Sequence, residues 1–263
     1  MIGAALLEIK GLTISFGGLV AVDGLDLAVG TGEIVGLIGP NGAGKTTVFN
    51  CVSRFYEPDR GTIRFKDRDI TGARSHEIIR FGIARTFQNV ELCRSMTTLE
   101  NLLLGQHVVR RGGVIRDGLR LRGAGADEAR ATTRADEMIE LLGLTDHRDR
   151  VVSVLPFRLQ KLVELGRALV SKPALLLLDE PTAGADHRES QALADLIRRM
   201  RDRFDLSVLV VEHDMSFVMG LCDRLYVLNF GRRIAAGTPA QVRSDPVVIQ
   251  AYLGEPEREV VDA

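Results

Sequence analysis

The chain has 263 residues and a mass of 28.8 kDa, and 45% of its residues are hydrophobic while 26% are charged. This composition is typical of a folded globular protein that buries a sizeable core. The 34 basic and 35 acidic residues give a formal net charge of -1. Near-neutrality disfavours a protein that coats nucleic acid or anionic lipid, because both partners attract a basic excess.

The sequence also lacks the signals of membrane insertion, secretion and disulfide bonding. Its apolar runs are far shorter than the roughly 20 residues that a membrane-spanning helix needs. Glu8 ends the apolar N-terminal run and no basic segment precedes it, so we expect no secretory signal. Cys51, Cys93 and Cys222 are widely spaced and odd in number, which disfavours a disulfide framework or a cysteine-rich zinc site. We therefore expect a folded protein of the cytosol.

Strands alternate with helices toward both ends of the chain. Short β-rich runs predict strands at residues 7–16, 21–29, 33–38, 175–178, 207–211 and 224–228. A helical pattern starts at Lys45, and apolar residues at helical spacing predict another helix over residues 187–204. Such alternation indicates a mainly parallel sheet covered by helices, so we expect an α/β fold.

The middle of the chain differs from both ends. From residue 98 to about residue 168 only helical stretches are found, at residues 99–107 and 128–142. Residues 110–126 between them are rich in Gly and Arg and lack apolar periodicity, which predicts a loop or hairpin. We interpret the middle as an all-helical subdomain inserted into the α/β core. A short helical tail follows from Pro239 and ends in a charged segment that we expect to fray.

A phosphate-binding motif follows the strand at residues 33–38. The motif is G-x-x-x-x-G-K-[ST], and the expected nucleotide-binding residues are Gly39, Pro40, Asn41, Gly42, Ala43, Gly44, Lys45, Thr46 and Thr47. The glycines let backbone N–H groups converge on a phosphate, and the helix N-terminus adds a positive dipole end. Lys45 is expected to contact the β- and γ-phosphates, and Thr46 to ligate Mg²⁺. A Gly-rich turn without a ligand would not account for the strand before it and the helix after it.

The apolar strand at residues 175–178 ends in two carboxylates, Asp179 and Glu180. Ligands of open α/β sheets bind at this edge, so Asp179 is expected to hold Mg²⁺ through water and Glu180 to polarise the attacking water. Acid–base assistance of this kind is worth ~10² to 10⁴ in rate. The alternative is that the two acids only cap a strand end. Together with the phosphate motif, they predict nucleotide hydrolysis.

With these two motifs the sequence resembles, almost end to end, the ATP-binding subunit of an ABC transporter. The resemblance implies a P-loop NTPase (RecA-like) core with an antiparallel β subdomain and an inserted all-helical subdomain. It places the nucleotide-binding core and its N-terminal β subdomain at residues 1–88 and 169–238. The helical subdomain with the signature region would span residues 89–168, and the C-terminal helical tail residues 239–263.

Further positions match functional motifs of that family. Gln88, in the run Arg-Thr-Phe-Gln-Asn, matches the Q-loop glutamine that senses the metal and the γ-phosphate. His213, in Val-Val-Glu-His-Asp, matches the switch histidine that contacts the γ-phosphate, and Phe16 stands where an aromatic ring usually stacks on adenine. The stretch similar to the D-loop, which crosses a dimer interface, consists of Ala183, Gly184, Ala185 and Asp186.

Several stretches resemble the branched-chain amino-acid uptake group within the family. They are residues 85–89, 96–103, 237–239 and 251–255. The longer helical insertion around residues 108–136 is similar to that of the larger of the two ATPase subunits in such importers. Urea importers and lipopolysaccharide-export ATPases share much of this pattern, so both remain alternatives.

The signature region departs from the family pattern L-S-G-G-Q. The aligned residues are Leu155, Pro156, Phe157, Arg158, Leu159 and Gln160. Proline is tolerated at a helix start, but Arg158 stands where the family has a glycine that lets N–H groups approach the γ-phosphate of a partner's ATP. The arginine either obstructs that approach, which costs roughly 3 to 4 kcal/mol per lost donor, or bonds the phosphate itself. We favour obstruction, which predicts a heterodimer with asymmetric sites.

The resemblance implies ATP and Mg²⁺ as cofactors and membrane permease subunits as partners. A second ATPase subunit would complete a dimer, with a heterodimer favoured over a homodimer, and an extracytoplasmic solute-binding protein would act indirectly. The chain would be peripheral, at the cytoplasmic face of the membrane.

A non-hydrolysing regulator remains an alternative because of Arg158, while a DNA-repair or translation ATPase lacks support in a chain of this length. Arginines at positions 110, 111, 116, 120 and 122 are interpreted as a solvated loop rather than a phosphate-binding patch.

Overall fold

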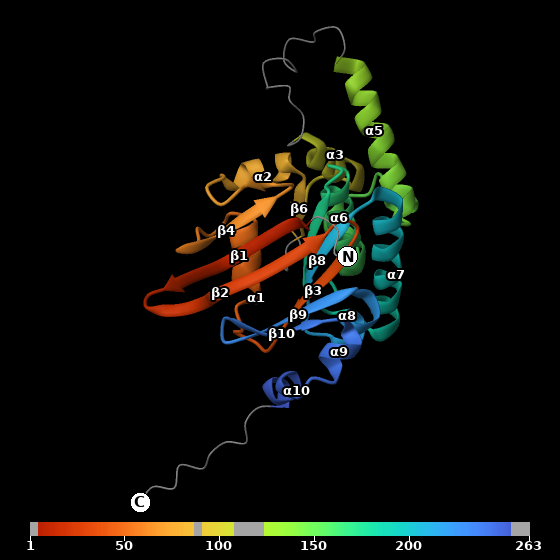
Figure 1. The fold of residues 1–263 in the computed structure, drawn as a ribbon. Helices are drawn as coiled ribbons and strands as arrows, with labels where there is room; N and C mark the ends of the chain where they lie inside the picture. The colour runs from red at the N-terminus through yellow and green to blue at the C-terminus, as the bar shows by residue number, and fades with distance from the viewer. Residues whose placement is uncertain (1–4, 87–90, 108–123, 254–263) are drawn as a thin grey trace, which may run out of the picture.

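The computed structural model describes residues 5–86, 91–107 and 124–253, whose strands form two sheets (Figure 1). The first sheet is antiparallel, in the order β2-β1-β4-β5, and consists of β1 (Ala5–Phe16), β2 (Leu19–Gly30), β4 (Arg60–Phe65) and β5 (Arg68–Asp69). The larger sheet has the order β10-β9-β3-β8-β7-β6. Its strands are β3 (Ile34–Ile38), β6 (Ile83–Arg85), β7 (Leu175–Asp179), β8 (Ser207–Val211), β9 (Arg224–Asn229) and β10 (Arg232–Gly237). Its strands are parallel except β10.

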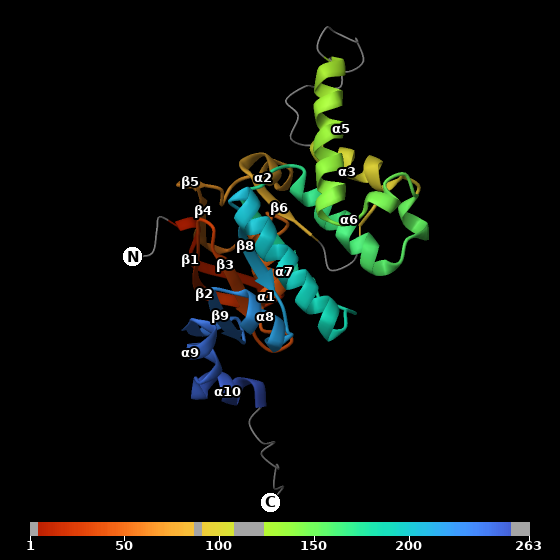
Figure 2. The ribbon, with the colours of Figure 1, turned by 90° about the vertical axis from the view of Figure 1, so that its right-hand side faces the viewer.

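Helices cover the larger sheet and form a separate group beside it. They are α1 (Lys45–Val52), α2 (Ser75–Phe81), α3 (Thr98–His107), α5 (Ala124–Leu141), α6 (Phe157–Leu169), α7 (His187–Phe204), α8 (Met215–Leu221), α9 (Pro239–Arg243) and α10 (Pro246–Leu253). Two short 3-10 helices, Thr145–His147 and Val152–Val154, precede α6. Figure 2 shows α7 lying across the larger sheet, with α3, α5 and α6 grouped to one side. None of the described helices is long and apolar enough to cross a membrane.

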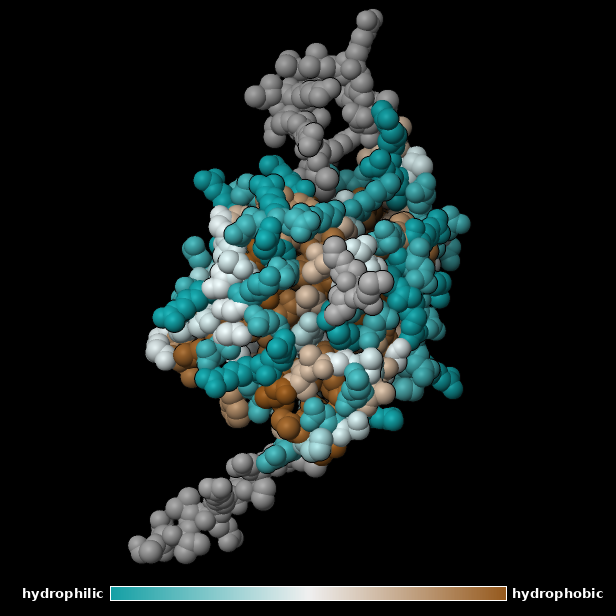
Figure 3. Space-filling view, viewed as in Figure 1, coloured by the Kyte–Doolittle hydropathy of each residue, from teal (hydrophilic) through white to brown (hydrophobic). Residues whose placement is uncertain are grey.

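The central strands are apolar throughout because both faces of the larger sheet are buried. Along β7, Leu175 and Leu177 face a core shared with the antiparallel sheet and α1, whereas Leu176 and Leu178 face a core shared with α7. The same alternation recurs along β3 and β8. The sheet is therefore held from both sides, and its strand ends are fixed in position. The outer surface is mostly hydrophilic in Figure 3, with hydrophobic residues visible in the middle of that face and toward its lower end.

The helices beside the sheet share its second core. Leu102, Met138 and Val163, from α3, α5 and α6, belong to the same buried cluster as the α7 face of the sheet. The backbones of α3 and α6 approach closely, since a Cβ on Gly105 would lie 2.2 Å from the carbonyl oxygen of Arg167. A side chain at that position would force the two helices apart.

The α/β fold class, the six expected strands and the helix at residues 187–204 are confirmed. The boundary of the predicted loop at residues 110–126 is wrong at its end, because α5 already begins at Ala124. Residues 110–123 of that loop, and the tail segment 255–263, lie outside the described residues. The strands β4, β5, β6 and β10 and the helix α2 are not among the elements expected from the sequence.

Candidate nucleotide-hydrolysis site

The phosphate loop connects the buried end of β3 to the first residue of α1. Gly39, Gly42 and Gly44 have φ angles of 151°, 78° and 100°, in the region that L side chains rarely adopt. A Cβ on Gly39 would lie 2.1 Å from the carbonyl oxygen of Leu228, and one on Gly44 would lie 2.5 Å from that of Ala21. Gly39 and Gly44 are therefore required both by the backbone conformation and by the strands that pass against the loop, whereas Gly42 is required by its conformation alone.

Lys45 is the first residue of α1 and is only 7% exposed. Its Nζ donates hydrogen bonds to the carbonyl oxygens of Gly39 at 2.7 Å and of Pro40 at 2.9 Å, which places the ammonium inside the curve of the loop. Burial lowers the pKa of Lys45, and the carboxylates of Glu180 and Asp179 act in the opposite direction. The loop and the two carboxylates are thus electrostatically coupled. Thr46 is exposed and Thr47 is half-buried.

Asp179 is the last residue of β7 and is 4% exposed. Its Oδ2 accepts a hydrogen bond of 2.8 Å from the guanidinium of Arg85, at the end of the neighbouring strand β6. Arg85 also donates to Asn50 Oδ1 at 2.8 Å and to Ser53 Oγ at 3.2 Å, both on the chain around α1. The arginine thereby ties the carboxylate to the helix that follows the phosphate loop. In the sequence Arg85 stands out only as part of the Arg-Thr-Phe-Gln-Asn run, because its contact with Asp179 depends on the pairing of β6 with β7.

Glu180 follows Asp179 with a φ of 45°, a left-handed conformation that is uncommon for a residue with a side chain. Its N–H donates to the carbonyl oxygen of Val211 at 2.9 Å, so the turn after β7 stays attached to the end of β8. His213 lies just beyond that end, and its imidazole is 59% exposed. Because β3, β8 and β7 are adjacent and parallel, the loops that follow them meet at one edge of the sheet.

Phe16 lies at the end of β1 and is 44% exposed. Its ring makes an edge-to-face contact with Tyr56, with 5.1 Å between the ring centroids. Strand β2, which pairs with β1, passes directly behind the phosphate loop at Ala21. The exposed ring of Phe16 therefore belongs to the same hairpin that supports the loop, and its partner Tyr56 lies between α1 and β4. Gln88 lies outside the described residues.

The altered signature region forms the start of α6. Pro156 is the N-cap residue, and the side-chain amide of Gln160 donates to the carbonyl oxygen of Leu155 at 2.8 Å. The Arg158 side chain is 61% exposed and its guanidinium lies 3.7 Å from the carboxylate of Glu189 on α7. The arginine thus pairs with α7 of its own chain.

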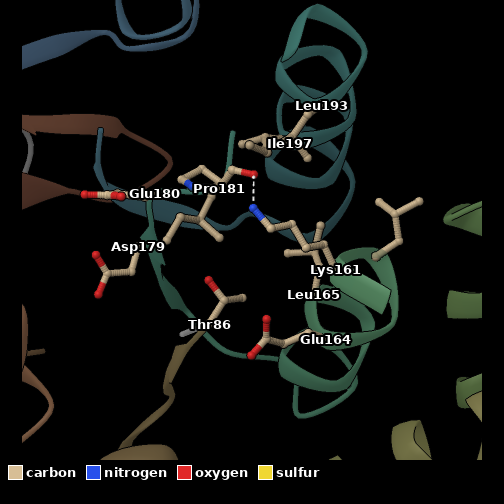
Figure 4. A pocket seen from close by; sticks show the side chains of 11 residues that line it. Thr86, Lys161, Glu164, Leu165, Asp179, Glu180, Pro181, Leu193 and Ile197 are labelled. Carbon is tan, nitrogen blue, oxygen red and sulfur yellow. Dashed lines mark hydrogen bonds between the residues drawn. The ribbon is translucent and has the colours of Figure 1, made fainter. Parts of the chain in front are cut away.

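The stretch from Ala183 to Asp186 leads into α7. Asp186 is the N-cap of that helix and accepts a hydrogen bond of 2.8 Å from the N–H of Glu189. Lys161 of α6 donates to the carbonyl oxygen of Ala183 at 2.7 Å, so the signature helix and the predicted D-loop are in contact within one chain. Lys161 also donates to the carbonyl oxygen of Pro181 (Figure 4). Lys161 could not be identified from the sequence, because a lone lysine on a helix carries no distinctive pattern.

The donor set at the sheet edge fits a magnesium ion. The Thr46 hydroxyl and the Asp179 carboxylate are hard oxygen donors, which Mg²⁺ prefers. No group of three or more His, Cys, Asp or Glu side chains that could hold a metal occurs among the described residues. This arrangement suits an ion that keeps several waters and is shared with substrate phosphates rather than enclosed by protein ligands.

Comparisons with known proteins agree with this geometry. A family profile described as ABC transporter matches residues 22–183, and one described as branched-chain amino acid ATP-binding cassette transporter matches residues 232–258. The high-affinity branched-chain amino acid transport ATP-binding protein LivG of Escherichia coli (strain K12) is 45% identical over 95% of this chain and 98% of that protein. The corresponding protein BraF of Pseudomonas aeruginosa is 42% identical with the same coverage. The lipopolysaccharide export system ATP-binding protein LptB of Acidithiobacillus ferridurans is 35% identical over 95% of this chain and 97% of its own length.

Solved structures are similar along nearly the whole chain. The ADP conformation of an ATP-binding cassette of an ABC transporter gives a TM-score of 0.83 at 32% identity, covering 95% of this chain and 99% of that one. A nucleotide-free ATP-binding cassette gives a TM-score of 0.82 at 31% identity, covering 95% and 100% of the two chains.

Proposed function

This chain belongs to the ABC transporter family of ATP-binding subunits, and from that premise we propose that it hydrolyses ATP to energise an importer of branched-chain amino acids. The observation that carries the proposal is that the phosphate loop, the Asp179–Glu180 pair and the loop with His213 follow three adjacent parallel strands. The cargo is supported by the match of residues 232–258 to the branched-chain amino acid ATP-binding cassette profile, and by the two branched-chain amino acid transport relatives that are 45% and 42% identical.

In the proposed mechanism the chain positions charge around the phosphates rather than forming covalent bonds. Backbone N–H groups of residues 41–47 cradle the phosphates, and the Lys45 ammonium neutralises charge on the β- and γ-phosphates. Glu180 accepts a proton from the attacking water, and His213 contacts the γ-phosphate. The ring of Phe16 stacks on adenine.

Three residues would hold the metal ion in this scheme. They are Thr46, Gln88 and Asp179. When bound, Mg²⁺ neutralises charge that develops on the phosphate oxygens. The ion pair between Arg85 and Asp179 keeps that carboxylate aligned at the end of β7.

We also propose that two such subunits close over two ATP molecules and that hydrolysis reopens them. The core at residues 1–88 and 169–238 would bind nucleotide, and the helical subdomain at residues 89–168 would pass the motion to the permease. The tail is assigned to residues 239–263. This assembly would hold the chain at the cytoplasmic face of the membrane, with an extracytoplasmic binding protein delivering the solute.

Arg158 is the basis for a finer proposal, a heterodimer with one impaired site. It stands where the family signature has glycine, and its exposed guanidinium occupies space on the surface that would face the partner's ATP. This chain's phosphate loop would then pair with an intact signature of a second ATPase subunit. The impaired site would be the one at which Arg158 faces the partner's phosphate loop.

The test is to purify the complex that forms with the permease and to measure its ATPase activity in proteoliposomes. Addition of the binding protein loaded with leucine, isoleucine or valine should stimulate turnover, whereas urea or lipopolysaccharide should not. Stimulation by urea or lipopolysaccharide instead would reject the amino-acid cargo. A complex that binds ATP without hydrolysing it would favour the regulatory alternative.

A further inference from the structure

The segment directly after Glu180 is contacted by a fully buried carboxylate and a half-buried ammonium. This segment, residues 181–183, runs between the signature helix α6 on one side and the loop after β8 on the other. Lys161 reaches it from α6, and Glu212 reaches it from the end of β8. Neither residue has a role in the mechanism described above.

Glu212 is fully buried, with an exposed fraction of 0%. Its Oε1 accepts hydrogen bonds from the N–H of Thr182 at 2.8 Å and from the Thr182 hydroxyl. Its Oε2 accepts from the N–H of His213 at 2.8 Å and from that of Asp214 at 3.2 Å. Each oxygen therefore serves a different loop, and one carboxylate joins the turn after β7 to the residue expected to contact the γ-phosphate. A buried carboxylate is stable only with such a set of donors.

Lys161 holds the same segment from the opposite side. Its Nζ donates to the carbonyl oxygen of Ala183 at 2.7 Å and to that of Pro181 at 3.3 Å, the second of which is drawn in Figure 4. Burial lowers the pKa of Lys161, and Glu212 is the first of the nearby carboxylates that raise it again. The ammonium and the Glu212 carboxylate are thus electrostatically complementary across the segment.

We propose that Lys161 and Glu212 are positioning residues that hold residues 181–183 between them and so couple the signature helix to Glu180 and His213. This inference rests on the proposed function, because it assigns the coupling to that reaction. A displacement of α6 acts on two carbonyl groups within three residues of Glu180. The same displacement reaches the N–H of His213 through the Glu212 carboxylate. Movement of the helical subdomain would therefore be transmitted to the proposed base and to the switch histidine together.

Conservative substitutions of Glu212 and Lys161 can remove these hydrogen bonds while nearly keeping the size of the side chains. Glutamine has the same size but carries one acceptor oxygen and one NH₂ donor, so it can accept hydrogen bonds from only one of the two loops. Lys161→Met keeps the apolar stem of the side chain and removes the donors to residues 181–183. Both substitutions should disturb the orientation of the reacting groups without touching the phosphate loop.

The experiment measures kcat, KM for ATP, equilibrium binding of ATP and the unfolding temperature for the full chain in its complex. In Glu212→Gln and in Lys161→Met, kcat should fall about 10- to 100-fold while KM and ATP affinity change less than about twofold. The double variant should be no slower than the slower single variant, because both act on one segment. Lys161→Arg should recover most of the activity, since a guanidinium can also donate to two carbonyl groups.

Glu33→Gln is the matched control. Glu33 is a half-buried carboxylate that pairs with Arg224 and accepts a hydrogen bond from the N–H of Gly30. It directly precedes β3, at the opposite end of that strand from the phosphate loop. The substitution should lower the unfolding temperature and leave kcat unchanged. The inference is overturned if Glu212→Gln and Lys161→Met hydrolyse ATP at the rate of the unsubstituted chain, or if their effects on kcat multiply in the double variant. The proposed function fails separately, if the unsubstituted complex hydrolyses no ATP.

Discussion

The phosphate edge of the larger sheet and the signature region at the start of α6 are built in opposite ways. At the phosphate edge the central charged side chains are enclosed, since Lys45 is 7% exposed and Asp179 is 4% exposed. At the signature region Phe157 is 54% exposed and the Arg158 side chain is 61% exposed. One region lies at the ends of strands that are buried on both faces, and the other lies on the surface.

The difference shows which part of the proposed reaction a single chain prepares by itself. Enclosed groups with fixed hydrogen bonds keep their orientation before any ligand arrives, and such preorganisation is what stabilises developing charge. The exposed Arg158 is restrained by a 3.7 Å ion pair with Glu189, and exposed pairs contribute little. The signature region therefore depends on a partner surface to define its geometry. The effects of substitutions in the two regions should therefore differ both in the property that changes and in the magnitude of the change.

The largest effect is expected from Glu180→Gln at the phosphate edge, because the substitution removes the proposed proton acceptor and keeps the size of the side chain. Because the site at which Arg158 faces the partner is proposed to keep a residual turnover, kcat of the complex should fall by about 10²- to 10³-fold, with ATP affinity retained. Steady-state ATPase assays and equilibrium ATP binding measure both quantities. Asp202→Asn, at an exposed position of α7, is the control and should behave as the unsubstituted chain. Turnover retained in Glu180→Gln would show that the phosphate edge does not hold the base.

The second-largest effect is expected from the buried ion pair between Arg85 and Asp179. Arg85→Met leaves the Asp179 carboxylate buried without its ion pair, so the free energy of unfolding should fall by about 3 to 5 kcal/mol. Denaturant titration measures this change. Arg232 pairs with Asp23 on the surface, where the two side chains are 73% and 40% exposed, so Arg232→Met should cost at most about 1 kcal/mol. An equal decrease in the free energy of unfolding for Arg85→Met and Arg232→Met would contradict the proposed difference between the buried and the exposed ion pair.

The third effect tests the signature region. In a chain that already carries Glu180→Gln, the remaining turnover comes from the site at which Arg158 faces the partner. Adding Arg158→Gly should raise that turnover by about 10²- to 10³-fold, because the glycine restores the approach of N–H donors to phosphate. Single-turnover hydrolysis in the assembled complex measures it. A decrease would instead mean that the guanidinium itself binds the phosphate.

The smallest effect is expected from the ion pair between Arg158 and Glu189. Glu189→Gln removes the charge and should change the free energy of unfolding by less than about 1 kcal/mol. Asp186→Ala, one turn earlier, removes the N-cap of α7 and should cost about 0.5 to 2 kcal/mol. Thermal or denaturant unfolding of the two variants compares them. A larger cost for Glu189→Gln would mean that the signature region is fixed within one chain.

Much of the fold could be predicted because it depends on local patterns. Apolar residues at helical spacing predict α7 with the bounds that the structure has. The predicted helix at residue 128 begins later than α5, which starts at Ala124, because Gly125 lowers the helix propensity of the first turn. Strand β6 has three residues and, among the strands of the described ranges, pairs with β7 alone. Its extended conformation depends on that neighbour, so no period in the sequence marks it.

The residues of the candidate site likewise fall into those that the sequence predicts and those that only the tertiary structure brings together. The glycine and lysine pattern of the phosphate loop, the apolar strand before it and the acids after β7 could be recognised from adjacent residues, because each depends on backbone conformation and short-range spacing. The contacts of Arg85 with Asp179, of Glu212 with Thr182 and of Lys161 with Ala183 join residues 94, 30 and 22 positions apart. The order of strands in the sheet and the packing of α6 against it bring these pairs together. Only the tertiary structure decided them, because a hydrogen bond between distant residues leaves no periodic trace along the chain.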